Sequence, residues 1–325
     1  MTIYSVIGAG VAGLTVATEL VERGAEVQVF DPAGPPGPHG CSWWAGGMLA
    51  PWCEYENAEE PVLRFGQEAI DWWTHHTKVT KSGTLVVASK RDMPDLRRFA
   101  RRTEGFSEIG REGVAELEPD LHGFGQGLFF ENEAHLDPRK ALLDLHRGLQ
   151  DKAVTFHKKQ APAGLQNTID CRGLSARERL NDLRGVKGEM LVIRAPDVEI
   201  TRPVRLLHPR IPLYIVPRGE SIYMLGATMI ESEDSSRITA RSMLELLSAS
   251  YALNPAFGEA EVLEIGVDLR PAFPDNLPRV RRLGGTIYAN GLYRHGYLLA
   301  PALARAVADL ALHNTQSEMV DEDRD

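Results

Sequence analysis

The stretch that decides the fold is IYSVIGAGVAGLTVATELVERGAEVQVFD, residues 3–31. It opens with a short run rich in β-branched side chains, which is typical of a buried strand, and it closes with a second such run. Gly8, Gly10 and Gly13 stand between the runs in a GxGxxG spacing, and apolar residues then recur at helical spacing. Asp31 ends the second run. The order of strand, glycine-rich turn, helix, strand and acid predicts a βαβ unit that binds a dinucleotide.

Each position of the glycine-rich turn has a physical role in holding a pyrophosphate. Gly8 makes the tight turn, Gly10 lets the backbone approach the ligand, and Gly13 lets the helix pack on the strand. Val11 and Ala12 begin the helix, where unpaired N–H groups and the positive end of the helix dipole face the phosphates. A glycine-rich turn that binds no ligand is the alternative, and the surrounding βαβ pattern argues against it.

Asp31 is placed to accept hydrogen bonds from the ribose hydroxyls of the dinucleotide. A carboxylate at this position disfavours a 2′-phosphate, so the sequence argues against NADP as the ligand. The motif does not distinguish NAD from FAD, because both dinucleotides use it.

The composition argues against several classes of protein. The chain has 325 residues and 43% hydrophobic content, enough for a large core and, as a prior, two domains. The formal net charge of −9 argues against nucleic acid and membrane surfaces as partners. No apolar stretch reaches the roughly 18 residues of a membrane span, and the N-terminus has no signal-peptide pattern. Cys41, Cys53 and Cys171 have the spacing of neither a disulfide framework nor a metal site. We therefore expect a cytoplasmic protein with free thiols and no metal.

A second glycine-rich segment, CSWWAGGMLAP at residues 41–51, follows a loop rich in proline and glycine. Ser42 is a candidate phosphate ligand or helix cap. Gly46 and Gly47 precede Met48 and would let the backbone run close to a flat ligand. The two tryptophans of the segment would serve equally well as packing.

The second half of the chain alternates apolar and polar residues in the manner of an antiparallel sheet. Tyr214 and Met229 lie on such strands, where an aromatic residue or a methionine is ordinarily core. Arg270 precedes a proline, which holds it extended, and its planar guanidinium matches a carboxylate bidentately. The alternative for Arg270 is a surface ion pair with Asp268 or Asp275.

The stretch NGLYRHGYLLAP, residues 290–301, joins a predicted strand to an apolar helix. It places Arg294 and His295 immediately before Gly296, at the start of that helix. The N-terminus of the helix is a second candidate site for negative charge. No role for His295 emerges from the sequence.

These motifs together resemble the D-amino-acid oxidase family of FAD-dependent flavoproteins, and within it the glycine oxidase branch most. The resemblance rests on the GxGxxG turn with its acid, on S-x-x-A-G-G-M-L-A-P, on YIVPR followed by GATM, and on G-x-x-R-x-G-x-x-L-A-P. They occur in order along nearly the whole chain. The resemblance implies FAD as the cofactor. We expect it to be non-covalent, because no cysteine after Cys171 is present to anchor a flavin.

The family resemblance also assigns site residues. It implies further cofactor contacts from two segments: Ser42, Gly46, Gly47 and Met48 in the first, and Arg294, His295, Gly296, Tyr297 and Leu298 in the second. It implies a substrate site in which Tyr214 and Arg270 bind the carboxylate, Met229 lies near the substrate carbon, and Arg294 lies near the mouth. No side chain is predicted to be catalytic in itself, because the redox chemistry belongs to the cofactor.

The predicted fold class is α/β, with a Rossmann-like FAD-binding domain and an α+β substrate domain built on an antiparallel sheet. The domains are discontinuous: FAD binding from residues 1–60, 135–185 and 276–315, and substrate binding from 61–134 and 186–275. Residues 316–325 are polar and acidic, and are predicted to be a disordered tail.

The activity that the resemblance implies is the oxidative deamination of glycine or another small D-amino acid. Hydride would pass from the substrate to flavin N5, O₂ would become H₂O₂, and the imine would supply the thiazole of thiamine. The alternatives are an oxidase of sarcosine or other secondary amines, a D-amino-acid dehydrogenase, and a dinucleotide-binding protein without turnover. Family relatives are often homotetramers, so a homo-oligomer is a further expectation.

Overall fold

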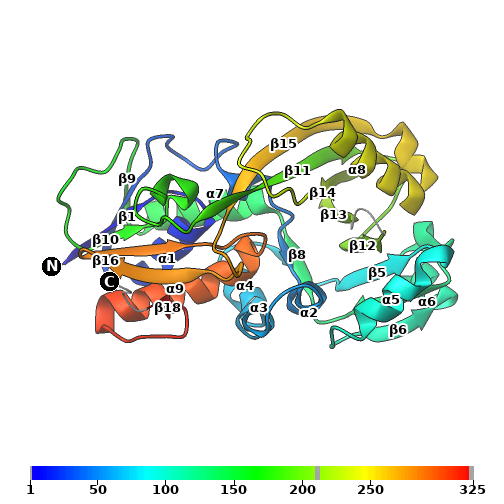
Figure 1. Ribbon diagram of the computed structural model, residues 1–325, viewed down its shortest axis with the longest axis horizontal. Coiled ribbons are helices and arrows are strands. Elements are labelled where there is room, and N and C mark those ends of the chain that lie inside the picture. The colour runs from blue at the N-terminus through cyan, green and yellow to red at the C-terminus, as the bar shows by residue number, and fades with distance from the viewer. Residues whose placement is uncertain (1, 209–212, 322–325) are drawn as a thin grey trace.

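The computed structural model describes residues 2–208 and 213–321 of the chain. It contains two large sheets side by side along an elongated molecule (Figure 1). The first and last strands of the described chain, β1 (Ile3–Ile7) and β18 (Val320–Asp321), both belong to the first of these sheets. In the described ranges, no helix has the length and apolarity that crossing a membrane requires.

The first sheet has seven strands, and its centre is parallel because the glycine-rich turn returns the chain through a helix. Across the sheet the strands are β18 (Val320–Asp321), β16 (Arg279–Leu283), β17 (Thr286–Asn290), β10 (Thr168–Asp170), β1 (Ile3–Ile7), β2 (Glu26–Phe30) and β9 (Thr155–His157). The helices packed with it are α1 (Val11–Glu22), α3 (Glu60–Gly66), α4 (Ala69–Thr74), α7 (Pro138–Asp151) and α9 (Gly296–His313). We call this sheet with its helices the first-sheet unit.

One part of the predicted domain division differs from the structure. Residues 61–74 were assigned to the substrate domain, but α3 and α4 pack in the core of the first-sheet unit. Trp73 is fully buried there, and its Nε1–H donates to the carbonyl of Tyr297 at 2.7 Å. The apolar face of these short helices covers α9, which the sequence pattern of either segment alone does not reveal.

The second sheet has eight strands and is antiparallel except where β12 pairs with β5. In order the strands are β15 (Glu261–Ala272), β11 (Arg184–Arg194), β14 (Ile222–Gly226), β13 (Leu213–Gly219), β12 (Val204–Leu207), β5 (Thr84–Ala88), β7 (Gln126–Phe130) and β6 (Ser107–Gly110). The helices beside it are α5 (Met93–Ala100), α6 (Arg111–Leu117) and α8 (Ala240–Leu253). We call this the second-sheet unit.

Short elements occupy the joint between the two units. A three-stranded sheet consists of β3 (Met48–Leu49), β8 (Ala134–Leu136) and β4 (Val79–Thr80), and α2 (Pro51–Tyr55) follows β3 directly. The 3₁₀-helix η1 (Cys41–Trp44) also lies at the joint, because it packs against both α7 and β15. The other 3₁₀-helices are η2 (Lys90–Asp92), η3 (Pro119–Leu121), η4 (Gly173–Ala176) and η5 (Pro255–Glu259), and η3 and η5 pack in the second-sheet unit. The joint therefore contains the segment 41–51 that the sequence singled out.

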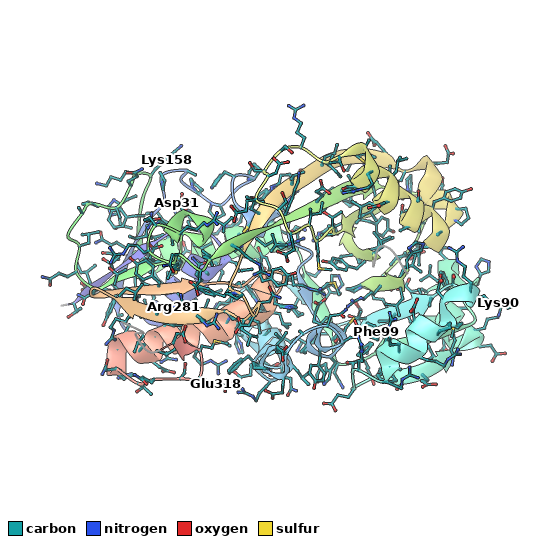
Figure 2. All side chains as sticks on the ribbon, in the orientation of Figure 1. Asp31, Lys90, Phe99, Lys158, Arg281 and Glu318 are labelled. Carbon is teal, nitrogen blue, oxygen red and sulfur yellow. The ribbon has the colours of Figure 1, made fainter. Side chains whose placement is uncertain are left out.

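The predicted disordered tail is ordered over its described part. Val320–Asp321 forms β18, which pairs in parallel with β16. Asp321 accepts from Arg281, which is labelled in Figure 2, at 3.0 Å. Met319 is buried. The buried methionine and this ion pair offset the cost of ordering a polar segment. Residues 322–325 of the predicted tail lie outside the described residues.

Candidate active site

A cavity of about 890 Å³ is lined by residues of both units, close to the upper end of the range for small-molecule and cofactor sites. From the first-sheet unit it takes the glycine-rich turn, the end of β2 and the start of α9. From the second-sheet unit it takes parts of β11, β13, β14 and β15. The predicted site residues that line it are Gly8, Gly10, Val11, Ala12, Asp31, Ser42, Gly46, Tyr214, Arg270, Arg294, Gly296 and Tyr297.

The three glycines of the turn differ in what surrounds them. Gly8 has φ +101°, and a Cβ there would lie 2.8 Å from the carbonyl oxygen of Cys171. A Cβ at Gly13 would lie 1.8 Å from the carbonyl oxygen of Gly8. A Cβ at Gly10 would meet only Ser42 Oγ, at 3.4 Å, so its other side is open to the cavity. Gly8 and Gly13 are therefore required because a side chain would clash with neighbouring backbone. A side chain at Gly10 would instead project into the cavity and compete with a ligand for space.

Asp31 and Ser42 bind the two ends of the glycine-rich turn. Asp31 Oδ2 accepts from the N–H of Ala9 at 2.8 Å, which fixes the acid at the cavity wall. Ser42 Oγ accepts from the N–H of Val11 at 3.1 Å, so it caps α1 from a distant segment. Of the two roles predicted for Ser42, the structure shows the helix cap. In the described structure, the N–H of Ala12 has no acceptor and remains available to a ligand.

The N-terminus of α9 lies beside the N-terminus of α1. A Cβ added to Gly296 would lie 3.6 Å from Val11 Cγ1, so the two helix starts are in contact. The Tyr297 hydroxyl holds the neighbouring loops, at 3.0 Å from the carbonyl oxygen of Ser42 and 3.0 Å from that of Pro138. Two positive helix ends therefore converge on one cavity, which favours an anionic ligand there.

The segment around Gly46 is held by a buried cation. Arg218 donates to the carbonyl oxygens of Ala45 at 3.1 Å, Gly46 at 2.8 Å and Leu136 at 2.9 Å. Burial lowers the pKa of Arg218 to about 10, so the guanidinium stays charged at neutral pH. A Cβ at Gly46 would lie 3.4 Å from the Tyr214 ring. The backbone of this segment is thus pressed close to the substrate-side wall of the cavity.

Several predicted cofactor residues do not line the cavity. Gly13 and Gly47 allow close backbone packing. A Cβ at Gly13 would lie 1.8 Å from the carbonyl oxygen of Gly8, and one at Gly47 would lie 2.3 Å from that of Leu136. Met48 belongs to β3 and packs beside the core of the second-sheet unit, while Leu298 is buried against Gly66. His295 is buried outside the cavity wall and faces Glu54.

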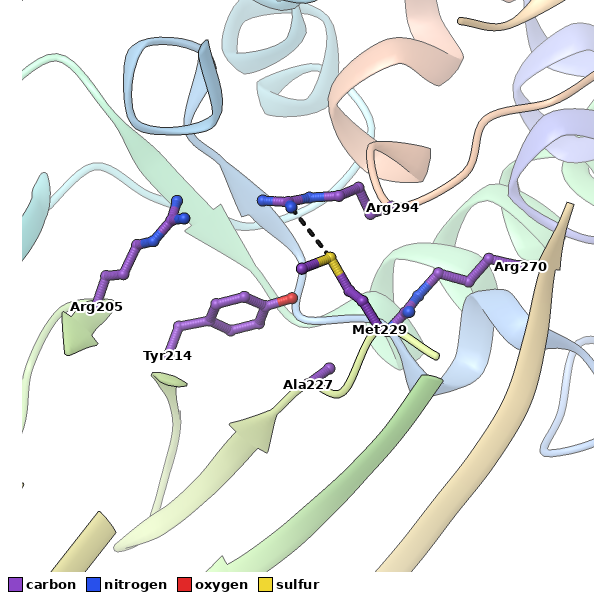
Figure 3. Close-up of a pocket in the computed structure, with 6 residues that line it drawn as sticks. All are labelled: Arg205, Tyr214, Ala227, Met229, Arg270 and Arg294. Carbon is purple, nitrogen blue, oxygen red and sulfur yellow. Dashed lines mark hydrogen bonds between the residues drawn. The ribbon is translucent and has the colours of Figure 1, made fainter. Parts of the chain in front are cut away.

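A much smaller cavity adjoins the large one, with room for about one water molecule at about 10 Å³. Figure 3 shows its six lining residues. They are Arg205, Tyr214, Ala227, Met229, Arg270 and Arg294. The four predicted substrate residues are therefore brought together, from three separate parts of the chain, around one strongly cationic space.

Arg270 reaches this space across the face of the second sheet. Its guanidinium crosses Gly188, where a Cβ would lie 2.3 Å from Arg270 Cζ, and it donates to the Thr228 carbonyl at 3.0 Å. Within residues 2–208 and 213–321 no carboxylate lies within ion-pair distance of it. Asp275 pairs instead with Arg279, at 2.6 Å. The surface ion pair considered for Arg270 is therefore absent from the described structure, and its guanidinium faces the cavities.

Arg294 is paired with a carboxylate that sequence reasoning missed. Its guanidinium donates to Glu54 of α2, and His295 Nδ1 lies 3.5 Å from the same carboxylate. Burial opposes ionisation of Glu54, but the charges of Arg294, of His295 when it is protonated at acid pH, and of Arg205 prevail and lower the pKa of Glu54 to about 2. Burial lowers the pKa of His295 to about 4 in spite of Glu54. At neutral pH the cluster therefore contains an ionised Glu54 and a neutral His295.

The comparisons with known proteins decide the family. The family model named DAO, described as FAD dependent oxidoreductase, matches residues 4–310. The chain belongs to this family. A putative thiamine biosynthesis oxidoreductase, ThiO, of Rhizobium etli is 54% identical over 93% of this chain and 94% of its own length. A glycine oxidase of Pseudomonas aeruginosa is 25% identical over 94% of this chain and 93% of its own.

Solved structures match over nearly the whole chain. The glycine oxidase of Geobacillus kaustophilus superposes with a TM-score of 0.82 at 20% identity, covering 98% of this chain and 97% of that one. An iminodiacetate oxidase from Chelativorans has a TM-score of 0.81 at 21% identity, covering 99% of both chains. At these identities the matches establish the fold. The predicted family, fold class and FAD cofactor of this DAO-family oxidoreductase are confirmed.

The residues of the large cavity fit FAD. The open side of Gly10, the free N–H of Ala12 and the two helix ends suit a pyrophosphate and an electron-rich ring edge. Residues of the loop 160–165 line the cavity together with Asp31. This loop is a part of the cavity wall that the sequence did not reveal, because nothing in its composition marks a binding segment.

The structure shows how the two tryptophans of the segment 41–51 are used. The ring of Trp44 lies against Gly266, where a Cβ would be 2.4 Å from it. Both tryptophans of η1 lie near the guanidinium of Arg139, which is bonded to Glu264 at 2.7 Å. They therefore connect α7 of the first-sheet unit to β15 of the second.

Proposed function

We propose that this DAO-family enzyme oxidises glycine or another small D-amino acid with non-covalent FAD as cofactor and O₂ as electron acceptor. The observation that carries the proposal is Arg270, a guanidinium without a carboxylate partner in the described structure, beside Tyr214 at the wall of an FAD-sized cavity. Such a cation fits the carboxylate that every amino acid carries. The first-sheet unit would hold FAD, and the second-sheet unit would hold the substrate.

Arg270 and Tyr214 would bind the substrate carboxylate from opposite sides of the small cavity. The Thr228 carbonyl fixes the direction of the Arg270 guanidinium through one N–H and leaves its other donors for the substrate. Arg294 contributes positive charge near the entrance but remains bonded to Glu54. Met229 lines the same small cavity, and its sulfur accepts from Arg294 at 3.3 Å.

The protein's contribution to the reaction is placement and electrostatics. FAD held in the large cavity would supply the redox chemistry, namely acceptance at N5 of the hydride from the substrate Cα and delivery of the two electrons to O₂, which would give H₂O₂. The substrate ammonium must lose a proton first, and solvent water could accept it. Glu54 stays ionised and His295 stays neutral at neutral pH, so neither is assigned a proton transfer. Hydrolysis of the imine then releases ammonia.

We propose further that the imine supplies thiamine biosynthesis. The support is the 54% identity to a Rhizobium etli protein whose name places it in that pathway. Coupled assembly of the thiazole from glycine in the presence of this enzyme would test the role. If glycine were oxidised but no thiazole formed, the proposed role in thiamine biosynthesis would be wrong and the proposed oxidase activity would stand.

The direct test uses the purified yellow protein with glycine, sarcosine, D-alanine and D-proline. Anaerobic bleaching of the flavin reports reduction, and peroxide release in air reports the oxidase reaction. Bleaching without peroxide would show a dehydrogenase, and a preference for sarcosine would show a secondary-amine oxidase. If none of the four amino acids bleached the flavin, the proposed function would be wrong.

A further inference from the structure

Arg205 is the residue of the small cavity that the proposed reaction leaves without a role. It lies on β12 and pairs in register with Tyr214 on β13, which puts the two side chains next to each other on one face of the sheet. It lines the cavity with Arg270 and Arg294 (Figure 3). The residue is only 2% exposed. A guanidinium this deeply buried requires partners.

The partners of Arg205 in the protein are incomplete. Its closest acceptor is the Cys53 carbonyl, at 3.2 Å from Nη1. Glu54 and Glu56 lie at 4.0 and 3.7 Å, beyond hydrogen-bond distance. The buried Nε–H has no acceptor in the described part of the chain. Arg139, by contrast, makes a bidentate pair with Glu264 at 2.7 and 3.0 Å.

The two carboxylates near Arg205 are also shared with other arginines. Glu54 is bonded directly to Arg294, and Glu56 lies 3.6 Å from Arg102 at the surface. His295 adds no charge because it stays neutral at neutral pH. The cavity therefore has more guanidinium donors than its own carboxylates can satisfy. The α-carboxylate of a substrate on Arg270 would still leave Arg205 incomplete.

We propose that Arg205 forms a second anion subsite, and that the enzyme accepts a small amino acid carrying a second carboxylate. The inference rests on the proposed function, in which Arg270 and Tyr214 bind the first carboxylate. The reacting carbon and its amine would then lie between two arginine sites, Arg270 on one side of Tyr214 and Arg205 on the other (Figure 3).

Met229 occupies the room that the second carboxylate needs. Its side chain lies between the arginines in Figure 3, and the residue is 46% exposed. Its sulfur is contacted by Arg294 at 3.3 Å and by the Tyr293 hydroxyl at 3.8 Å, and thioethers are weak acceptors. An unbranched side chain with three rotatable bonds turns aside at small cost. Movement of Met229 would join the small cavity to the large one.

Binding to the FAD-loaded enzyme tests the subsite without turnover. Diglycolate and methoxyacetate contain an ether oxygen in place of the amine and differ only in the second carboxylate. Titration calorimetry should show diglycolate binding about tenfold to a hundredfold more tightly, the value of one or two charge-assisted hydrogen bonds. Arg205→Met should reduce that ratio towards one. Equal affinities in the unmodified enzyme, or an unchanged ratio in folded Arg205→Met, would overturn the subsite.

Arg102→Met is the matched control, because it removes the other cation beside Glu56 without touching the cavity. The affinity ratio of diglycolate to methoxyacetate should be the same in Arg102→Met as in the unmodified enzyme. A fall in this ratio as large as that in Arg205→Met would overturn the proposal. Met229→Ala provides a variant that does not disturb the core, and it should raise the ratio by opening the space. An unchanged or lower ratio there would contradict the assigned position of the second carboxylate.

Turnover then identifies where the second carboxylate is attached. Iminodiacetate against sarcosine tests attachment through nitrogen, and D-aspartate against D-alanine tests attachment through carbon. A higher kcat/KM for the dicarboxylate in either pair supports the subsite, and a lower value in both pairs overturns it. If no amine bleaches the flavin while diglycolate still binds selectively, the proposed function fails and the anion subsite stands.

Discussion

Replacing Glu54 with glutamine should destabilise the folded protein by about 3 kcal/mol. The pKa of this carboxyl is displaced from 4.5 to about 2, because three nearby basic side chains outweigh the effect of burial. Each pKa unit is worth about 1.4 kcal/mol, so the displacement corresponds to about 3 kcal/mol. Breaking a buried ion pair on one side costs about 3–5 kcal/mol, which agrees because Arg294 is only 11% exposed.

The penalty should depend on pH in a defined direction. A carboxyl whose pKa is lower in the folded state contributes stability above its unfolded pKa and loses it as pH falls through the folded value. Between about pH 4.5 and pH 2 the unmodified protein therefore loses the contribution of Glu54, while the glutamine variant has nothing to lose. The difference in free energy of unfolding between the unmodified protein and Glu54→Gln should be about 1 kcal/mol smaller at pH 4 than at pH 7.

Urea unfolding followed by tryptophan fluorescence measures both effects, with the same FAD concentration for each protein. Glu60→Gln is the control, because Glu60 makes an exposed helical pair with Arg64 at 3.1 Å and should change the free energy of unfolding by at most about 0.5 kcal/mol. Equal losses in the two variants, or a gap at pH 4 as wide as at pH 7, would refute the reasoning about the buried cluster.

Three further predictions address the cofactor, the substrate and a buried acid. Gly10→Val should fold but lose FAD, since its side chain has space beside Ser42 yet projects into the cavity; a normal ratio of flavin to protein absorbance after gel filtration would contradict this. Arg270→Ala should raise KM for glycine about tenfold to a hundredfold with FAD retained, and steady-state kinetics like those of the unmodified enzyme would move the carboxylate site elsewhere. Burial raises the pKa of Glu133 to about 8, so the folded state holds a proton that the unfolded state releases, and stability falls as pH rises from about 4.5 to 8. Glu133→Gln should therefore be about 4 kcal/mol more stable than the unmodified protein at pH 8, and urea midpoints that are equal there would show that this carboxyl ionises normally.

The fold was predictable because local and global signals agree along most of the chain. The βαβ unit at residues 3–31 forms as its spacing predicts, with β1 and β2 parallel and in register. Residues 61–74 were assigned to the substrate domain and pack instead in the core of the first-sheet unit. The pattern of an amphipathic segment indicates a buried face but not which element covers that face. The tail was misjudged for a related reason, because its order comes from β16 and not from its own composition.

The site was predictable where backbone geometry or a family motif constrains the residue type. Gly8 has φ +101°, a conformation that favours glycine. The GxGxxG motif therefore identifies this position from the sequence alone. Glu54 and Arg205 were not predictable, because each has its role only through residues far away in the chain. Arg205 gains significance by lying opposite Tyr214 across two strands, and that register is set by the sheet.

The two units attract anions by different physical means, and the difference explains why α2 is central to the site. At the starts of α1 and α9 the positive charge is partial, fixed in direction and carried by the backbone, so it needs no neutralising side chain. Arg294 and Arg205 carry full charges in a buried place, where a nearby carboxylate offsets part of the cost of burial. Glu54 supplies it, bonding Arg294 at the start of α9 while the preceding residue's carbonyl accepts from Arg205 of β12. One short helix therefore bonds arginines of both units, so a substitution in α2 should disturb both arginines at once.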